Sequence, residues 1–268
     1  ISLIVFLRPL GLRLGAELSI EAAASVKGVP YHPGAAKYFE EKGFKVDAVK
    51  EGAGNGTASA LSFGTGGESG TYYAFGGVLA SFVSGKSNCK VTALTSGGSQ
   101  ANVEDLTNGN VQLAFVQSDV MNYAYNGQRL FDSPVTGFSV VAQLYQEQVQ
   151  IVTTNPDIKT VADLAGKKVS IGAAGSGVYF NAIDVLSAYD LKESDISAVY
   201  QSFGDSAESL KDGKIDAAFI VAGAPTTAIT DLATAGSVYL VSLDDSHVQS
   251  LLSASPYYTA ATIKAGTY

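Results

Sequence analysis

Two glycine-rich segments combine small polar residues in a pattern that suits the binding of an anion. They run from Phe63 to Ala74 and from Ile171 to Ala182. Each is typical of a strand, a glycine turn and a helix start, with a serine at the turn and aromatic residues in the first helical turn. A helix start offers N–H groups and partial positive charge, and glycine lets a ligand approach the backbone. The pair predicts two similar lobes whose helix starts face a shared cleft.

The candidate donors for such an anion lie at these helix starts and at other strand ends. Arginine is scarce, which disfavours a bidentate arginine clamp on a carboxylate. The residues expected to bind from the two segments are Gly67, Ser69, Gly70, Thr71, Tyr72, Ser176, Gly177, Val178 and Tyr179. The residues expected from elsewhere are Ser99, Gln117, Ser118, Tyr145 and Pro225. The alternative interpretation is structural: the glycines only permit tight turns, Ser99 only caps a helix, and the tyrosines belong to the core.

Nucleotide binding and catalysis are less well supported by the same residues. The glycine spacings are only partial dinucleotide fingerprints, and no Gly-Lys-Ser/Thr follows either one. His32 lies beside Pro33, which is typical of a loop rather than of a catalytic base. The expected cleft offers only Glu68, Asp119, tyrosines and serines as a nucleophile or base, so an enzyme acting on a small anion stays open as an alternative.

Composition excludes several other classes. The single cysteine, Cys89, excludes a disulfide within the chain and a cysteine metal cluster, and we expect no cofactor. The net charge of -8 disfavours nucleic acid as a partner. The 46% hydrophobic content of the 268 residues excludes a disordered chain and is enough for two lobes. The apolar run at residues 1–7 is too short to cross a bilayer and lacks the features of a signal peptide.

The rest of the chain alternates between strand and helix patterns, which predicts an α/β protein with mostly parallel sheets. Residues 51–59 are small and polar, as in a flexible linker. The expected strands or extended runs are 60–63, 91–94, 111–116, 138–144, 149–154, 168–172, 198–202, 215–221, 238–243 and 257–263. The expected helices are 17–26, 35–42, 71–84, 99–107, 118–125, 160–164, 176–189, 206–211 and 225–235. Thr160 and Asp163 predict a capping box at the start of the short helix at 160–164.

Several motifs together resemble one family of transport receptors. They are residues 61–77, 95–103, 113–119, 161–172, 175–177, 211–219 and 224–228. These segments closely resemble the TRAP-associated extracytoplasmic immunogenic (TAXI) proteins, which are the solute receptors of TRAP transporters. The resemblance covers about residues 60–268. It implies a two-lobed type II periplasmic-binding-protein fold, also called a Venus flytrap.

The order of the segments departs from that family. Residues 28–43 resemble the C-terminal end of these receptors, yet here they precede the N-terminal motif. We therefore expect a circular permutant joined at 51–59, engineered as a sensor or split binder. The family also continues beyond the motif at residues 265–268 with a strand and a helix of the first lobe. Residues 1–16, or a second chain, would have to replace them.

The resemblance implies the following organisation and function. Residues 1–16 are unassigned, 17–50 pack on lobe 1, 60–145 form lobe 1, 146–256 form lobe 2, and 257–268 cross back as a strand. Hinges would lie near Gln146 and Tyr257. The ligand would be a small organic acid such as glutamate, glutamine or 2-oxoglutarate, and the partners would be membrane subunits of a TRAP transporter. The natural parent would be extracytoplasmic, in the periplasm or as a cell-surface lipoprotein, and not an enzyme. A structural module that no longer binds is a further alternative.

Overall fold

The computed structural model describes residues 18–49 and 58–268. The expectations for residues 1–16 and for most of the linker at 51–59 lie outside these described residues. The chain divides into two compact units. Unit 1 holds residues 1–58 and 121–146, and unit 2 holds residues 59–120 and 147–268. Unit 2 therefore contains both sheets of the structure, which the sequence had assigned to separate lobes.

Unit 1 is a small helical unit around the side chain of Tyr31. Its helices are α1 (Ile20–Ala23), α2 (Pro33–Glu41) and most of α5 (Ser118–Asn126). Tyr31 is almost fully buried, and isolated bridges pair it with Ala48 and Val140. Its hydroxyl donates to Ala23 O and accepts from Val26 N, both at 2.9 Å. The extended run expected at 138–144 is not a strand; it contributes only the bridge at Val140.

His32 is a helix cap in unit 1. It precedes Pro33, the first residue of α2, and its Nδ1 accepts from Gly34 N at 3.1 Å. Proline is favoured at a first helical position because that position needs no N–H bond within the helix. This arrangement agrees with the expectation of a loop residue rather than a base.

The first sheet of unit 2 is parallel, with the strand order β2-β1-β3. Its strands are β1 (Ala60–Gly64), β2 (Lys90–Leu94) and β3 (Leu113–Ala114). Helix α3 (Thr71–Lys86) connects β1 to β2, and helix α4 (Ser99–Thr107) connects β2 to β3. β3 is shorter than the expected 111–116. Beyond β3, the backbone of Phe115 bonds a side chain: Asn102 Nδ2 donates to Phe115 O at 2.7 Å and also to Thr65 O at 2.8 Å.

The second sheet of unit 2 is mixed rather than mostly parallel, with the order β6-β5-β7-β4-β8. Its strands are β4 (Gln148–Thr153), β5 (Lys168–Ser170), β6 (Ser197–Val199), β7 (Ala217–Ala222) and β8 (Tyr239–Leu240). β5 is parallel to both β6 and β7, whereas β4 is antiparallel to β7 and β8. The amino end of β4 therefore lies at the same edge as the carboxyl end of β7, where Gln148 pairs with Ala222.

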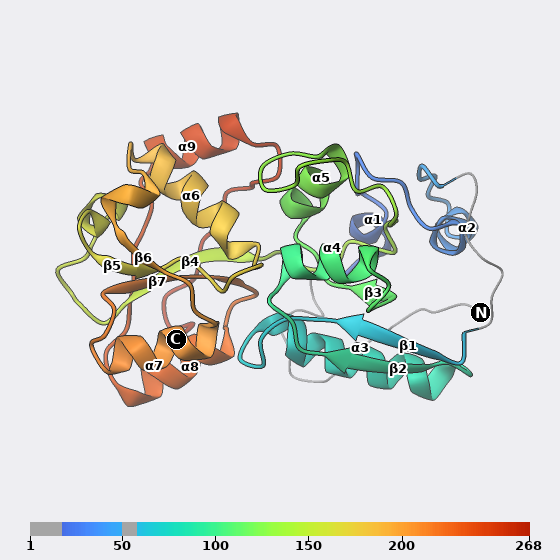
Figure 1. The fold of residues 1–268 in the computed structure, drawn as a ribbon, viewed down its shortest axis with the longest axis horizontal. Helices are drawn as coiled ribbons and strands as arrows, with labels where there is room; N and C mark the ends of the chain where they lie inside the picture. Colours follow the sequence, from blue (N-terminus) through green and yellow to red (C-terminus); the bar gives the residue numbers. More distant parts are fainter. Residues whose placement is uncertain (1–17, 50–57) are drawn as a thin grey trace. The chain divides into compact units, whose positions relative to one another are not determined.

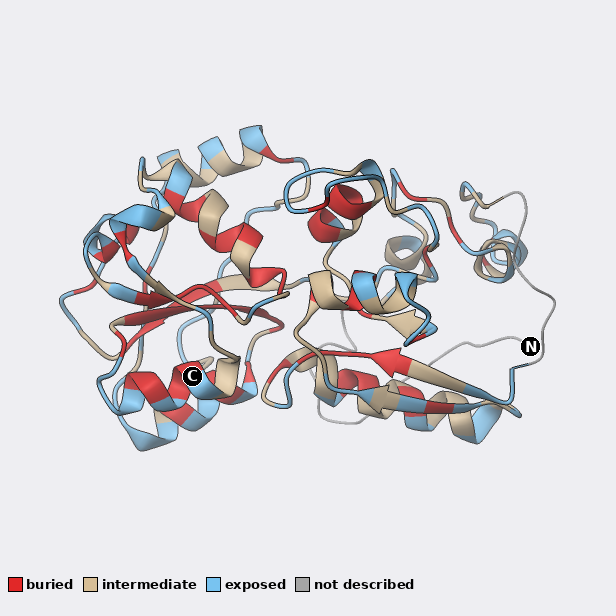
Figure 2. Cartoon of the chain, viewed as in Figure 1, coloured by how far each residue is buried: buried red, intermediate tan, exposed pale blue. Residues whose placement is uncertain are grey.

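Helices cover both faces of the second sheet. They are α6 (Val178–Ala188) and α9 (Asp245–Ala254) on one face, and α7 (Phe203–Lys211) and α8 (Thr227–Ala235) on the other (Figure 1). All six residues of β7 are buried (Figure 2). Successive residues pack alternately into the two apolar cores, one on each face of the sheet. This follows from the two-residue period of a strand, and a strand covered on both faces reads as one apolar run.

Two short 3₁₀ helices connect elements of this sheet, Val161–Leu164 and Glu193–Asp195. The first begins as the sequence predicts. The Asp163 carboxylate accepts from Thr160 N at 2.8 Å and from the Thr160 hydroxyl at 3.0 Å. This short-range signal needs no tertiary contact, which explains why the sequence reveals it.

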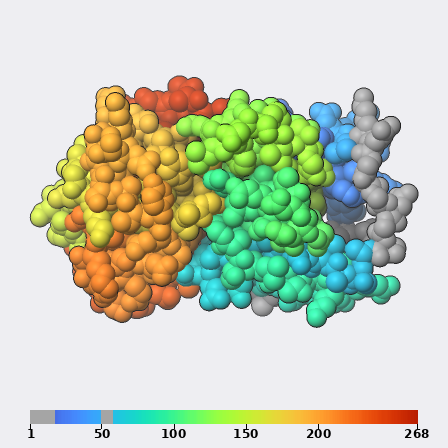
Figure 3. Space-filling model, viewed as in Figure 1, coloured from blue at the N-terminus to red at the C-terminus, as the bar shows by residue number. Residues whose placement is uncertain are grey.

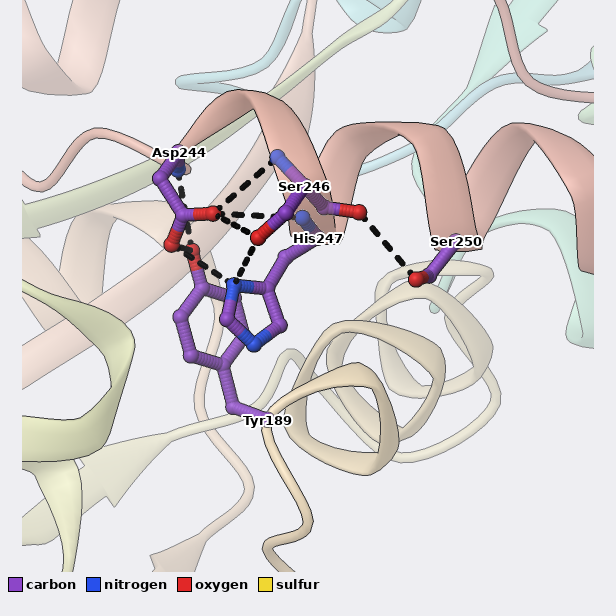
Figure 4. Close-up of polar contacts among 5 residues, drawn as sticks. All are labelled: Tyr189, Asp244, Ser246, His247 and Ser250. Carbon is purple, nitrogen blue, oxygen red and sulfur yellow. Dashed lines mark hydrogen bonds and ion pairs between the residues drawn. The ribbon is translucent and has the colours of Figure 1, made fainter.

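Helix α9 was not expected from the sequence. Its N-cap is Asp244, whose carboxylate accepts from Ser246 N and His247 N. The His247 ring stacks on the Tyr189 ring with centroids 3.6 Å apart, and the Tyr189 hydroxyl donates to Asp244 at 3.0 Å (Figure 4). Hydrogen bonds from Ser246 and His247 hold the pKa of Asp244 well below its ordinary value. This exposed cluster fastens α9 to the end of α6.

The prediction of a strand at 257–263 is wrong: these residues form turns and extended chain outside both sheets. Side chains hold the C-terminal segment instead. The Tyr258 hydroxyl donates to Asp184, and the Tyr268 hydroxyl contacts Gln150 and accepts from Thr226 N. Across the part of the chain that the structure describes, no helix has both the length and the apolar character needed to cross a bilayer.

Candidate functional site

A cavity of about 80 Å³ lies inside unit 2, where the two sheets meet. The segments around it are the starts of helices α3, α4, α6 and α7 and the end of β7. Its lining comprises Gly66, Gly67, Gly70, Thr71, Tyr72, Ser96, Gly97, Gly98, Ser99, Gln117, Glu147, Ala173, Ser176, Gly177, Val178, Ser202, Phe203, Val221 and Ala222. In open α/β sheets, ligands bind at this edge, beyond the carboxyl ends of the parallel strands.

Three of the four helices at the cavity begin at a glycine: α3 at Gly70, α4 at Gly98 and α6 at Gly177. Glycine has no side chain that could cap the first turn. The N–H groups of that turn then need partners from outside the helix, and the helix dipole favours an anion there. Gly98 has a φ of +115°, a conformation that other residues rarely adopt. The local backbone thus presents several N–H-rich helix starts to one small space.

Ser176 supplies the most informative polar atom of the lining. Its side chain is 6% exposed, and its Oγ has no hydrogen-bond partner among the described residues. A buried hydroxyl without a partner is costly, and most such groups in proteins are paired. This hydroxyl lies at the start of α6, where an anionic ligand group would also meet the N–H groups of the helix.

Glu147 is the only charged residue among the described residues that line the cavity. It immediately precedes β4, and its carboxylate accepts a hydrogen bond from Tyr72. Burial raises the pKa of Tyr72 well above its ordinary value, and the nearby Glu147 carboxylate raises it further. Tyr72 therefore remains a neutral phenol that donates a hydrogen bond across the physiological pH range.

Hydrogen bonds join the two sheet layers of unit 2 beside the cavity. Ala101 N donates to Gly175 O at 2.9 Å, and the Thr71 hydroxyl donates to Gly223 O at 3.2 Å. Ligand pockets commonly measure about 300–1,000 Å³, so a cavity of about 80 Å³ is small. On the face drawn in Figure 3, atoms of the teal and yellow segments of these layers meet without an open groove.

A buried polar network next to the cavity connects the same layers. Asn181 on α6 is its centre: Asn181 Oδ1 accepts from Gln117 Nε2 at 2.7 Å, and Asn181 Nδ2 donates to Asp119 Oδ2 at 2.9 Å and to the Tyr258 hydroxyl at 2.8 Å. Burial raises the pKa of Asp119 to about 6, and the charge of Asp184 adds to this rise. The network therefore contains a carboxylate that titrates in a mildly acidic range.

The cavity brings together most of the site residues predicted from the sequence. Those that line it are Gly67, Gly70, Thr71, Tyr72, Ser99, Gln117, Ser176, Gly177 and Val178. Those outside its lining are Ser69, Ser118, Tyr145, Tyr179 and Pro225. Of these, Ser118 and Pro225 are exposed, and the Tyr179 hydroxyl donates to Glu193 at 3.1 Å. Tyr145 belongs to unit 1, whereas the cavity belongs to unit 2.

Sequence reasoning missed the other lining residues: Gly66, Ser96, Gly97, Gly98, Glu147, Ala173, Ser202, Phe203, Val221 and Ala222. Most of them adjoin segments that the sequence did single out. Glu147 is the exception, because it precedes a strand instead of following one. It reaches the site because β4 is antiparallel to β7, and the sequence pattern does not reveal strand direction. Among the described residues, no cluster of His, Cys, Asp and Glu could hold a metal ion.

Comparisons with known proteins agree with this fold. A family model described as the NMT1-like family matches residues 63–268. A solved protein of Bordetella bronchiseptica RB50 is similar with a TM-score of 0.51 and 18% identity, over 69% of this chain and 56% of that one. The α/β fold class predicted from the sequence is confirmed, with one parallel and one mixed sheet.

Two further solved structures are similar with lower scores. The alkanesulfonate-binding protein SsuA from Xanthomonas axonopodis pv. citri, bound to MOPS, gives a TM-score of 0.49 and 19% identity over 70% of this chain. An ancestral arginine-binding protein bound to arginine gives a TM-score of 0.48 and 18% identity over 69% of this chain and 80% of that one. The chain spans only 61% of the length of that SsuA structure.

Proposed function

The chain belongs to the NMT1-like family, and on this basis we propose that it is a solute receptor rather than an enzyme. It would bind a small carboxylate, such as glutamate, glutamine or 2-oxoglutarate, between the two sheet layers of unit 2. The observation that carries this proposal is the buried Ser176 hydroxyl without a partner, at a glycine-capped helix start in the cavity. Hydroxyl and N–H donors at a helix start suit a carboxylate group.

The proposal includes the finer assignment to TAXI receptors of TRAP transporters, with an extracytoplasmic parent and membrane transporter subunits as partners. It also includes circular permutation of the chain, engineered for a sensor or split binder. Packing in unit 1 supports the permutation: residues 20–46 share a core with residues 121–142, including Phe39 and Val140. This is the arrangement expected if a C-terminal segment of the family precedes its N-terminal motif. A second chain that completes the first lobe is part of the same proposal.

Binding is tested by thermal unfolding with glutamate, glutamine, aspartate, 2-oxoglutarate, succinate and a sugar control. A ligand at 100 times its dissociation constant stabilises the native state by about 2.7 kcal/mol, which raises the melting temperature by several degrees. We expect at least one of the acids, and not the sugar, to produce this shift. A chain that responds to none of the acids contradicts the proposal and favours a module that does not bind.

The role of Ser176 is tested with Ser176→Ala and its counterpart Ser69→Ala, which lies outside the cavity lining. Loss of one hydrogen bond to a ligand charge weakens binding by roughly 1.5–3 kcal/mol, so S176A should lose about tenfold or more in affinity. S69A should bind as the wild type does. Equal affinities for the two variants would exclude Ser176 from the site.

A further inference from the structure

The side-chain amide of Gln117 has one end at the cavity and the other in the buried network of Asn181. Its Nε2 donates to Asn181 Oδ1 at 2.7 Å, and Asn181 lies outside the cavity lining. Its Oε1 lies against Gly177, since a Cβ added at Gly177 would be 2.0 Å from that oxygen. Ser99 Oγ lies 3.1 Å from the same position, and both Gly177 and Ser99 line the cavity. The amide oxygen is therefore the end of Gln117 that faces the cavity.

Neighbouring hydrogen bonds fix this orientation of the amide. Asn181 Nδ2 donates to Asp119 Oδ2 at 2.9 Å and to the Tyr258 hydroxyl oxygen at 2.8 Å. Burial raises the pKa of Asp119 to about 6, so at pH 8 this group is a carboxylate that can only accept. The Tyr258 hydroxyl donates its own hydrogen to Asp184 at 2.9 Å. Both partners thus require the nitrogen of Asn181, which leaves its oxygen for the nitrogen of Gln117.

The amide oxygen of Gln117 is an acceptor with an unused position. It accepts no hydrogen bond from the residues that the structure describes. Ser99 does not supply one, because its hydroxyl bonds Tyr72 and its Oγ accepts from Gln117 N at 3.0 Å. A ligand group that can only accept would leave two acceptors facing each other without a hydrogen between them. Each would then lose a bond that it makes in water.

We propose that Gln117 is a specificity-determining residue whose amide oxygen accepts a hydrogen bond from the C2 substituent of the ligand. The site would then select a 2-hydroxy or 2-amino acid over the 2-oxo acid with the same carbon skeleton. This inference rests on the proposed function, because it assigns the ligand class of the same cavity.

The position of Ser176 places the donor on the carbon next to the ligand carboxylate. Ser176 Oγ is buried without a partner among the described residues, and the carboxylate is proposed to lie beside it. Ser176 and Gly177 are consecutive, and Gly177 is the residue that the Gln117 oxygen lies against. A carboxylate at Ser176 therefore brings its C2 substituent toward the Gln117 oxygen.

This selection depends on a hydrogen and not on a charge. A hydroxyl and a carbonyl at C2 are both neutral and of similar size, but only the hydroxyl donates. Sites that bond a hydroxyl or N–H group of a ligand reject analogues that lack it, because the acceptor is left unpaired. The cavity measures about 80 Å³, so a ligand group at this point lies directly against the wall.

The test is isothermal titration of the full chain at pH 8 with L-glutamate, both enantiomers of 2-hydroxyglutarate, and 2-oxoglutarate. The variants are wild type, Gln117→Met, which keeps the length of the side chain without its amide, and the control Gln249→Met at an exposed position on α9. We expect the wild type to bind at least one of the donor-bearing acids about tenfold or more tightly than 2-oxoglutarate. In Q117M this preference should fall below about threefold, and Q249M should keep it.

The outcomes separate the two proposals. Binding of 2-oxoglutarate as tight as that of the best donor-bearing acid, or a wild-type preference in folded Q117M, would overturn the role of Gln117 and leave the receptor function intact. An absence of binding by all of these acids to the wild type would overturn the proposed function and this inference with it. Circular dichroism shows whether Q117M folds. If it does not, Gln117→Asn, which keeps the amide on a side chain one methylene shorter, should lose the preference in the same way.

Discussion

The two glycine-rich segments share a sequence layout but give different side chains to the cavity. Each has a serine before a glycine N-cap and a tyrosine at the second helical position. In the first segment the tyrosine, Tyr72, lines the cavity and the serine, Ser69, does not. In the second segment the serine, Ser176, lines the cavity and the tyrosine, Tyr179, bonds Glu193 outside it. Similar sequences at two helix starts therefore do not imply the same role.

The backbone of the two turns accounts for this difference. The second turn contains two glycines with positive φ, Gly172 at +91° and Gly175 at +78°. In the first turn, Gly67 has no positive φ, and nothing lies within 4 Å of a Cβ added there. The left-handed residues of the second turn bring Ser176 against Gly172, where its Oγ lies 2.5 Å from the position of an added Cβ. The turn conformation therefore decides which side chain faces the ligand space.

Gly172→Ala should lower the free energy of unfolding more than the variants that follow. Its φ of +91° disfavours alanine, and the added Cβ would lie 2.5 Å from both Ser176 Oγ and Val178 Cβ. Backbone strain of about 1–2 kcal/mol and overpacking of about 1–3 kcal/mol lower the unfolding free energy by about 4 kcal/mol. Gly67→Ala in the first turn should change it by less than about 0.5 kcal/mol. Urea denaturation measures both variants, and equal values would remove the proposed difference between the turns.

The second prediction concerns the polar network centred on Asn181 of α6, the helix that follows the second glycine-rich segment. Asn181 on α6 bonds Asp119, whose pKa is raised to about 6 by burial. The native state thus keeps a proton that the unfolded chain releases near pH 4. The resulting stability is fully present below about pH 4 and is lost as pH rises through about 6, a change of about 3 kcal/mol.

Asp119→Asn imitates the protonated acid, so it should abolish this loss. Unfolding free energies at pH 4 and pH 7.5 measure the effect as the difference between the variant and the wild type. Asp231→Asn, at an exposed position on α8, is the control for general charge effects. An Asp119→Asn protein with the same pH dependence as the wild type would refute the assignment.

The third prediction concerns the contact between the two sheet layers at Gly177, the N-cap of α6. A Cβ added at Gly177 would lie 2.0 Å from Gln117 Oε1 and 3.1 Å from Ser99 Oγ. We expect Gly177→Ala to disturb this contact and weaken ligand binding by about tenfold, equivalent to about 1.4 kcal/mol. Gly77→Ala on α3, where an added Cβ meets nothing within 4 Å, should bind normally. The affinities of the two variants are compared by titration with a ligand identified by thermal unfolding. Equal affinities would show that the contact between the layers accommodates a side chain at Gly177.

The smallest expected effect is that of Tyr179→Phe. This variant loses the hydroxyl bond to Glu193, so its stability should change by less than about 1 kcal/mol and its ligand affinity should not change. Tyr72→Phe loses the bond to Glu147 at the cavity and should reduce ligand affinity about fivefold, as expected for a bond of about 1 kcal/mol. A binding defect in Tyr179→Phe equal to that in Tyr72→Phe would show that the tyrosines at the two helix starts have the same role in binding.

Features that depend on near neighbours in the chain could be predicted from the local sequence. Helix α4 begins and ends where predicted, and the capping box of Thr160 and Asp163 forms. The glycine turns lead into helices α3 and α6 as expected, and β7 is a continuous apolar strand. Turn glycines, caps and hydrophobic period act over a few residues, so their signal is complete in the sequence.

Which of these features come together in space depends on long-range packing. The antiparallel direction of β4 brings Glu147 to the cavity, and side-chain bonds of Tyr258 and Tyr268 replace the strand expected at 257–263. Helix α9 is fastened by Tyr189 and its contacts with Asp244 and His247. Each of these joins residues distant in the chain, and such pairings depend on strand direction, burial and packing that no local pattern encodes.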